Sequence, residues 1–435
     1  FLEHFSSKST MFLYFSFLNG FELFNSLMNE DVNEKIYNKR ELVYKIGDFG
    51  YQINKSKDRL YNNIVIKYSE SIELKSQTLW ESRLDTIINT KPTIIYNHNS
   101  KSKEILVQDV QNNLYLLSAS GRIIWKINLG EQIQSIIHQI DFYKNGKNQF
   151  LFSTESKIHI IDILGNYIEK YPLSLRAKAT APMSLFDYEN DKNYRIIVPC
   201  EDKKVYLYNL EGSIIKGWEF GTTENVVKNK IKHYKIKSED YIVFNDDYKS
   251  YFILRNGKTK INFVSKFKFS EKNTIQLDLS AKTPKFVTSD NKGTLRFFYT
   301  NGKQDSLFIK EFSPNHTFQL KDIDKNGEND YIFTDENRLE IYNQSKKPIL
   351  TYQFESNISY EPTFYEFPDN KTMIGIVCAD VGKIYLIDTN GQEFSEFPLQ
   401  GISSFSINNL GDETNKFDLI VGYYNNLLYN YSIKY

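Results

Sequence analysis

Cysteine is almost absent from this chain, with only Cys200 and Cys378 among 435 residues. The two lie far apart and form no C-x-x-C motif, which argues against a disulfide framework and against a cysteine-based metal or redox site. No run of eighteen apolar residues occurs, so the sequence predicts no membrane-spanning helix. The chain also has no excess of either charge, because 54 Lys and Arg residues balance 54 Asp and Glu residues. The composition therefore carries no electrostatic signature of a nucleic-acid-binding protein.

Sequence motifs of the common enzyme classes are missing as well. The chain has no phosphate-binding loop, no G-x-G-x-x-G and no G-x-S-x-G, and its histidines show neither H-x-x-x-H nor H-E-x-x-H spacing. The six histidines are His4, His98, His138, His159, His233 and His316. We expect structural roles for them, and we predict no catalytic and no cofactor-binding residue.

Aromatic residues are abundant, at 15% of the chain with 31 Tyr and 32 Phe, a composition that favours β-strands. Short apolar strands recur, and most are followed by a turn glycine. These glycines are Gly121, Gly165, Gly212, Gly257, Gly302 and Gly391. They stand 44, 47, 45, 45 and 89 residues apart, so the last step spans two repeats. In the skipped unit the turn contains Ser345, Lys346 and Lys347 instead of glycine.

Two further features repeat at the same spacing. Each turn is followed by a strand that ends in a large apolar residue, at Leu84, Leu129, Leu173, Phe220, Phe263, Ile309, Phe354 and Leu399. A fully apolar run precedes each Tyr-rich strand and ends at Val107, Phe152, Val198, Phe244, Val287, Phe333, Val377 and Val421. Four short strands per unit with a period near 45 are typical of a β-propeller. We predict an all-β, eight-bladed propeller, with seven blades and a stray hairpin as the alternative.

The two ends of the repeat are offset in a way that predicts how the ring closes. Residues 78–84 resemble an outer strand but have no blade before them, and they match residues 123–129, with Trp80 and Trp125 in register. The last unit, around residues 419–431, has no outer strand after it. We therefore predict that the N-terminal strand completes the last blade, which removes an exposed sheet edge.

The N-terminal residues do not repeat, so we predict a partial α+β segment at 1–72 and a propeller at 73–435. The predicted N-terminal elements are a strand at 11–17, one or two helices within 21–45, and a hairpin at 51–54 and 63–68. Because the chain begins with Phe1, we expect it to be a fragment or a processed product, with any signal peptide lying upstream.

One loop has the spacing of a calcium site. Oxygen-bearing side chains alternate through it, at Asp322, Asp324, Asn326, Glu328 and Asp330. Alternate oxygens let a short loop wrap a hard cation, and Gly327 permits the sharp turn. The loop resembles the calcium loops of propellers with FG-GAP-type blades, but it departs from an EF-hand because Phe333 stands where a Glu is required. We predict a structural Ca²⁺ here, with an acidic solvated turn as the alternative.

Weaker acidic patterns occur elsewhere and are predicted to hold no ion. One runs from Asp141 to Gly146, and another contains Asp187, Glu189 and Asp191. The turns that follow the apolar runs are acidic too, at Asp109, Glu155, Glu201, Asp202, Asp246, Asp247, Asp290, Asp335 and Asp380. They would form an acidic rim on one face of a propeller, but we interpret them as ordinary turn chemistry.

Residues 104–220 resemble a family of Bacteroidota cell-envelope proteins in which a PQQ-like or WD40-like propeller follows an α+β domain. The resemblance is carried by residues 107–109, 113–116, 140–146 and 186–188, and the closing residues 419–422 and 428–431 add to it. It implies a location in the cell envelope, periplasmic or associated with the outer membrane. It brings no activity and no catalytic residues with it.

These observations favour a non-catalytic binding or scaffold protein whose propeller faces bind a protein or a surface polymer. One alternative is a glycan hydrolase or lyase that uses carboxylates near the axis of the ring. A quinoprotein dehydrogenase is a further alternative, although the chain lacks the adjacent cysteine pair that this class usually has.

Overall fold

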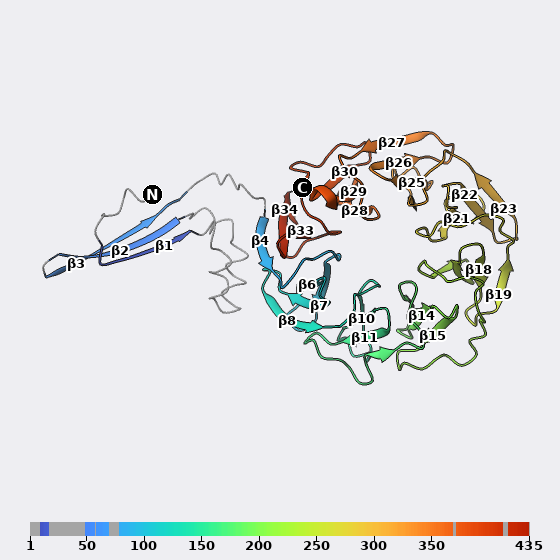
Figure 1. Cartoon of the computed structure of the whole chain (residues 1–435), viewed down its shortest axis with the longest axis horizontal. Coiled ribbons are helices and arrows are strands. Elements are labelled where there is room, and N and C mark those ends of the chain that lie inside the picture. The colour runs from blue at the N-terminus through green and yellow to red at the C-terminus, as the bar shows by residue number, and fades with distance from the viewer. Residues whose placement is uncertain are drawn as a thin grey trace.

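The computed structural model describes residues 9–16, 48–56, 58–68, 78–368, 371–411 and 416–434. These residues form antiparallel β-sheets and one short 3-10 helix, η3 (Ala379–Val381). Eight of the sheets follow one another around a ring, and a ninth lies near the N-terminus (Figure 1). This architecture is the β-propeller that the repeat predicts.

We name the strands of a blade inner, second, third and outer, counting from the axis of the ring. Blade 1 consists of β5 (Thr93–Asn97), β6 (Ser102–Gln108), β7 (Asn113–Leu117) and β8 (Ile123–Asn128). Blade 2 consists of β9 (His138–Ile140), β10 (Gln149–Ser153), β11 (Lys157–Ile161) and β12 (Leu173–Ser174). Blade 3 has three strands, β13 (Ser184–Phe186), β14 (Arg195–Pro199) and β15 (Val205–Tyr208). Blade 4 consists of β16 (Lys232–Ile236), β17 (Glu239–Asn245), β18 (Ser250–Ile253) and β19 (Thr259–Asn262).

The remaining blades continue in chain order. Blade 5 consists of β20 (Gln276–Asp278), β21 (Lys285–Ser289), β22 (Leu295–Tyr299) and β23 (Gln304–Leu307). Blade 6 consists of β24 (Thr317–Lys321), β25 (Asp330–Asp335), β26 (Arg338–Tyr342) and β27 (Pro348–Gln353). Blade 7 consists of β28 (Thr363–Phe367), β29 (Lys371–Cys378), β30 (Lys383–Asp388) and β31 (Leu399–Gln400). The last blade consists of β32 (Ser406–Asn408), β33 (Lys416–Tyr423), β34 (Leu427–Lys434) and β4 (Thr78–Arg83).

The last blade joins the two ends of the ring. Its outer strand β4 comes from the start of the repeat and pairs antiparallel with β34, placing Tyr429 opposite Glu81 and Leu427 opposite Arg83. Figure 1 shows β4 beside β34, close to the C-terminus. The predicted closure by the N-terminal strand is therefore what the structure has, and the pairing covers an edge that would otherwise be open.

The core lies between adjacent blades. The second strands β10 and β21 are buried at every residue, because a blade covers each of their two faces. Between blades 1 and 2, Leu106 and Leu114 pack against Phe150 and Phe152. Each such buried side chain contributes about 1.5–3 kcal/mol of transfer free energy. The apolar runs of the sequence are therefore the contacts that hold the blades together.

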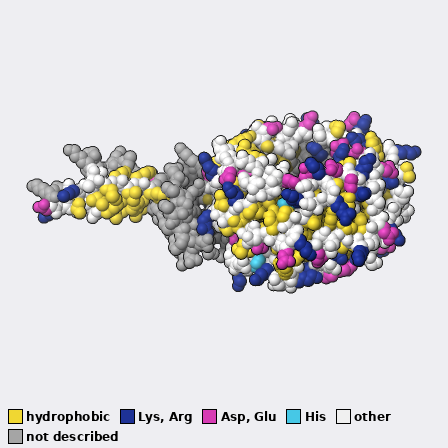
Figure 2. Space-filling model, turned by 60° about the horizontal axis from the view of Figure 1, so that its bottom comes forward, with side chains coloured by type: hydrophobic (Ala, Val, Ile, Leu, Met, Phe, Trp, Pro, Cys, Tyr) yellow, Lys and Arg dark blue, Asp and Glu magenta, His cyan; other side chains and the backbone are white. Residues whose placement is uncertain are grey.

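The N-terminal sheet has three strands, β1 (Met11–Ser16), β2 (Asp48–Ser56) and β3 (Arg59–Ile66), paired antiparallel in that order. Strands are therefore present where the sequence predicts a strand and a hairpin. The helices predicted within 21–45 lie outside the described residues. Figure 2 shows hydrophobic side chains gathered on this sheet, whereas charges of both signs are dispersed over the propeller.

No helix among the described residues is long and apolar enough to cross a membrane.

Candidate metal loop and lysine cluster

The predicted calcium loop is the connection between the inner strand β24 and the second strand β25 of blade 6. The two strands pair up to Lys321 opposite Asp330, so the intervening residues must reverse the chain in a compact turn. Lys325 and Gly327 adopt the left-handed conformation, with φ of 58° and 89°. This conformation points consecutive backbone amides inward, where they meet carboxylate oxygens.

Three carboxylates converge in this loop. Asp322, Asp324 and Asp330 each place an oxygen within 4.8 Å of the others. Asp322 accepts hydrogen bonds from the backbone amides of Asn326 at 3.1 Å and Gly327 at 2.9 Å. Like charges this close repel one another unless a proton or a cation lies between them.

Asp330 is the buried member of the group, with only 1% of its surface exposed. Its Oδ2 atom accepts a hydrogen bond from the amide of Ile323 at 3.0 Å, whereas its enclosed Oδ1 atom has no well-formed hydrogen bond, although the amide of Asp324 is close enough to lower the pKa of this carboxyl. Burial raises the pKa of Asp330 to about 6, and the charges of Asp324 and Asp322 add to the rise. A buried carboxylate grouped with two others is an arrangement that a hard cation would satisfy.

The other two predicted ligands take different positions. Asn326 donates a side-chain hydrogen bond to Asp324 Oδ2 at 3.0 Å and accepts one from the amide of Glu328 at 2.7 Å. The Glu328 side chain is exposed and does not belong to the converging group. The structure thus brings together three of the five predicted side chains and leaves Asn326 as their neighbour.

The first of the weaker acidic patterns forms the same kind of turn, and a lysine of the neighbouring blade pairs with its carboxylate. Asp141 accepts hydrogen bonds from the amides of Asn145 at 2.9 Å and Gly146 at 3.0 Å. The Lys192 ammonium, which belongs to the corresponding loop of blade 3, lies 2.6 Å from Asp141 Oδ2. Lys325, which lies within the Asp322 loop, pairs with Glu366 of blade 7 at 3.0 Å.

The acidic turns after the second strands are occupied by local hydrogen bonds. Asp109 accepts them from the amide of Asn113 and from the hydroxyl of Tyr115, each at 2.9 Å. Asp246 likewise accepts from the amide of Lys249 and the hydroxyl of Tyr251, each at 2.9 Å. These carboxylates stabilise the turn and the third strand. This agrees with the interpretation of the acidic turns as ordinary turn chemistry.

Several lysines stand where the inner strands begin, and sequence reasoning missed them. They are Lys91, Lys230, Lys232 and Lys272, at or just before the inner strands of blades 1, 4 and 5. Burial and the charge of Lys232 lower the pKa of Lys230 to about 8. Burial also lowers the pKa of Lys91, whose Nζ lies 6.0 Å from the centre of the Tyr365 ring.

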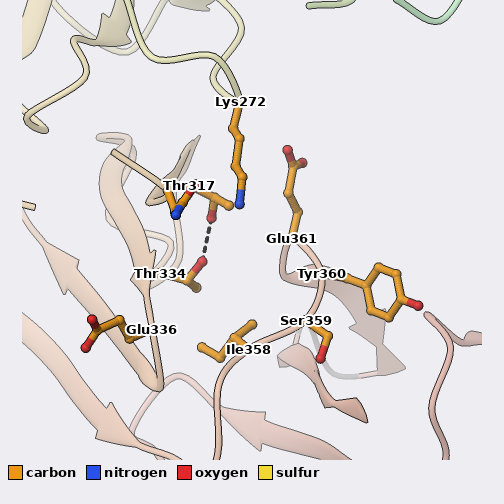
Figure 3. Close-up of a pocket in the computed structure, with 9 residues that line it drawn as sticks. Lys272, Thr317, Thr334, Glu336, Ile358, Ser359, Tyr360 and Glu361 are labelled. Atoms are coloured by element: carbon orange, nitrogen blue, oxygen red, sulfur yellow. Dashed lines mark hydrogen bonds between the residues drawn. The ribbon is translucent and has the colours of Figure 1, made fainter. Parts of the chain in front are cut away.

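A recess of about 210 Å³ lies between blades 5, 6 and 7, and one of these lysines, Lys272, lines it. Figure 3 shows Lys272 reaching into it near Thr317, with Glu361 extending into the same space. Burial raises the pKa of Glu361, and the hydrogen bond from Gln319 and the charges of Lys232 and Lys272 oppose that rise. In the sequence, the only sign of this arrangement is that lysines occur at the starts of inner strands. The closed ring places the lysines of different blades around one axis.

The described cysteines and the most buried histidines are embedded in the core. Burial raises the pKa of the Cys200 thiol to about 12 and that of Cys378 to about 11. His159 contacts the Thr154 and Tyr167 hydroxyls at 3.2 and 2.9 Å, and His316 lies 2.8 Å from the hydroxyl of Ser289. These side chains are enclosed by the neighbouring blades of the propeller.

The comparisons with known proteins concern the fold. No protein-family model and no curated protein matches the chain. Among solved structures, BamB from Moraxella catarrhalis is 14% identical with a TM-score of 0.51, over 82% of this chain and 99% of that one. A complex of BBS1N with ARL6DN gives a TM-score of 0.47 at 12% identity, over 72% of this chain and 93% of that one. At this identity the likeness to BamB shows the β-propeller fold alone.

Proposed function

We propose that the chain is a non-catalytic binding or scaffold protein of the bacterial cell envelope, whose propeller binds another protein. The observation that carries the proposal is the closure of the ring by β4 on β34. Closure fixes every blade between two neighbours, so the loops on both faces are held on a rigid frame that suits recognition. The envelope location rests on the sequence resemblance of residues 104–220.

We further propose that Ca²⁺ braces the loop from Asp322 to Asp330. The support is the buried carboxylate of Asp330, whose Oδ1 atom has no well-formed hydrogen bond and which belongs to a group of three converging carboxylates. A bound ion would replace repulsion among the carboxylates by attraction and would stiffen the connection between β24 and β25. It would act on the structure of blade 6 and not on a substrate.

The scaffold proposal is tested by capture of partners from native envelope membranes with the tagged full-length protein, in calcium and in chelator. A stoichiometric protein partner is expected in calcium, and its loss in chelator would link the Asp322 loop to binding. If no protein is captured in either condition, the scaffold proposal is wrong. Release of reducing ends from a glycan panel by the same preparation would replace it with the hydrolase alternative.

A further inference from the structure

We infer that one side of the N-terminal sheet is the surface through which two copies of this chain associate. The inference goes beyond the binding proposed for the propeller and does not depend on it. Alternate residues of a strand point to the same side of a sheet, and the strand register aligns them in rows such as Leu13, Tyr51 and Ile64. We define the apolar face as the side that carries Met11, Leu13, Tyr51, Leu60, Ile64 and Ile66.

The apolar face is exposed to solvent. Its residues on the edge strands each have between 47% and 67% of their surface exposed, and they are Met11, Leu13, Leu60, Ile64 and Ile66. Within the three strands, the charged residue on this side is Lys55, which lies at the hairpin end of β2. Gln52, which points to the opposite side, is only 1% exposed. A sheet with an apolar side needs a second layer over it, and among the described residues this side has none.

The size of the apolar face matches what a dimer needs. Five large side chains that are about half exposed contribute on the order of 100 Å² each, and the half-buried Tyr51 adds to this. Each copy would therefore bury roughly 600 Å², and two copies about 1,200 Å², which is the lower end of the range for stable interfaces. Two such sheets would stack face to face at about 10 Å, as the layers of a sandwich do. Figure 2 shows hydrophobic side chains gathered on this sheet, which extends away from the propeller.

A polar pair on the apolar face favours a second copy over a lipid surface. The hydroxyl of Tyr51 donates a hydrogen bond to Asn62 Oδ1 at 2.9 Å, and both residues lie on this side of the sheet. The pair still offers the amide hydrogens of Asn62 as donors and the oxygen of Tyr51 as an acceptor. In a two-fold dimer the donor of one copy faces the acceptor of the other, so the pair is complementary to itself. Hydrocarbon chains offer no hydrogen-bonding partner.

The direct test is sedimentation equilibrium of the full chain over a wide range of concentration. We expect the parent to form a dimer, and we expect Ile64→Glu to weaken it at least about a hundredfold, because each dimer would bury two carboxylates in the interface. Leu13→Glu, on the other edge strand, is expected to have the same effect. The matched control is Tyr61→Glu, which is as exposed as these residues but points to the opposite side of the sheet and should leave the dimer unchanged.

Cross-linking tests the contact with a milder substitution. Both native cysteines are buried, so a cysteine introduced on the N-terminal sheet is the one that a bismaleimide reaches. We expect a short bismaleimide to link two copies of the Ile64→Cys variant and not of the Tyr61→Cys variant. Far-ultraviolet circular dichroism and urea denaturation check that all of the variants are folded.

Three results would overturn the inference. The first is a parent protein that stays monomeric at every concentration. The second is a dimer that Ile64→Glu and Leu13→Glu leave intact, because the contact would then lie elsewhere. The third is a monomeric parent that binds vesicles of phosphatidylethanolamine and phosphatidylglycerol while Ile64→Glu does not, because the apolar face would then serve a lipid surface.

Discussion

The indole of Trp80 donates a hydrogen bond across the blade boundary to the backbone carbonyl of Ala119, at 3.0 Å. Trp125 makes the same bond to Ile163 at 2.9 Å, one repeat further on. In each case the following turn glycine lies against the indole, so Gly121 packs on Trp80 and Gly165 on Trp125. The recurring tryptophan and glycine are therefore two halves of one contact between blades, and these tryptophans pack between blades.

This contact predicts unequal costs for alanine at equivalent turn glycines. A Cβ atom at Gly121 would lie 2.5 Å from Ser82 Oγ and 2.6 Å from the Trp80 ring, whereas one at Gly302 would meet nothing within 4 Å. Both residues have φ near 84°, so both substitutions strain the backbone. We expect Gly121→Ala to lower the free energy of unfolding by about 2–4 kcal/mol and Gly302→Ala by about 1–2 kcal/mol. Equal losses in chemical denaturation would contradict this account of the contact.

The corresponding turn of blade 6 has a lysine instead of glycine, and here we expect a substitution to glycine to stabilise the protein. Lys346 occupies the glycine position with φ of 66°, and its amide donates to the carbonyl of Asn343 at 2.9 Å, as Gly302 does to Tyr299. Lys346→Gly removes the left-handed strain without removing that bond, so we expect a gain of about 0.5–1 kcal/mol in unfolding free energy. Lys346→Ala keeps the strain and serves as the control. A glycine variant no more stable than the alanine variant would show that this position is not strained.

Calcium is expected to stabilise the parent protein and not the Asp330→Asn variant. If free Ca²⁺ exceeds the dissociation constant a hundredfold, binding adds about 2.7 kcal/mol to the free energy of unfolding. Asp330→Asn removes the buried ligand, so its melting temperature should be the same in calcium and in chelator. In chelator it should be at least as stable as the parent, because it no longer buries a carboxylate beside two others.

Asp187→Asn, in the corresponding loop of blade 3, is the matched control and is expected to respond to calcium as the parent does. If the melting temperature of the parent protein is the same in calcium and in chelator, the loop is an acidic turn that binds no calcium.

Acid sensitivity is expected from His159, which is 1% exposed and stacks on Phe152 at a ring distance of 5.0 Å. Burial and the charge of Lys157 lower the pKa of His159 from 6.5 to about 4. Between these values the unfolded chain binds a proton that the folded protein does not. This histidine's contribution is therefore present above pH 6.5 and is lost as the pH falls toward 4, by on the order of 3 kcal/mol.

Urea denaturation across pH 4 to 8 measures this effect. The parent should lose stability more steeply below pH 6.5 than His159→Gln, which has no ring to protonate. Parallel pH profiles for the two proteins would assign the acid sensitivity to other groups.

Much of the fold was predictable because the relevant information is local. The fully apolar run that contains Phe150 and Phe152 predicts a buried strand, and the spacing of Gly121 and Gly165 sets the length of a blade. For the acidic loop, the sequence predicts the loop and its alternating oxygens. Nothing local indicates that Glu328 points outward, because its orientation depends on how the turn closes between β24 and β25.

The sequence by itself thus determined the repeated blade, the order of its strands and the strand that closes the ring, because hydrophobic period and turn chemistry act over a few residues at a time. Only the tertiary structure decided which charges meet. Lys192 reaches Asp141 from the next blade, Lys325 reaches Glu366 of blade 7, and Asp330 lies beside two other carboxylates. Lys232 and Lys272 act on Glu361 because the ring brings their strands around one axis. Electrostatic energy depends on distance in space, and a closed ring makes neighbours of residues that are far apart in the chain.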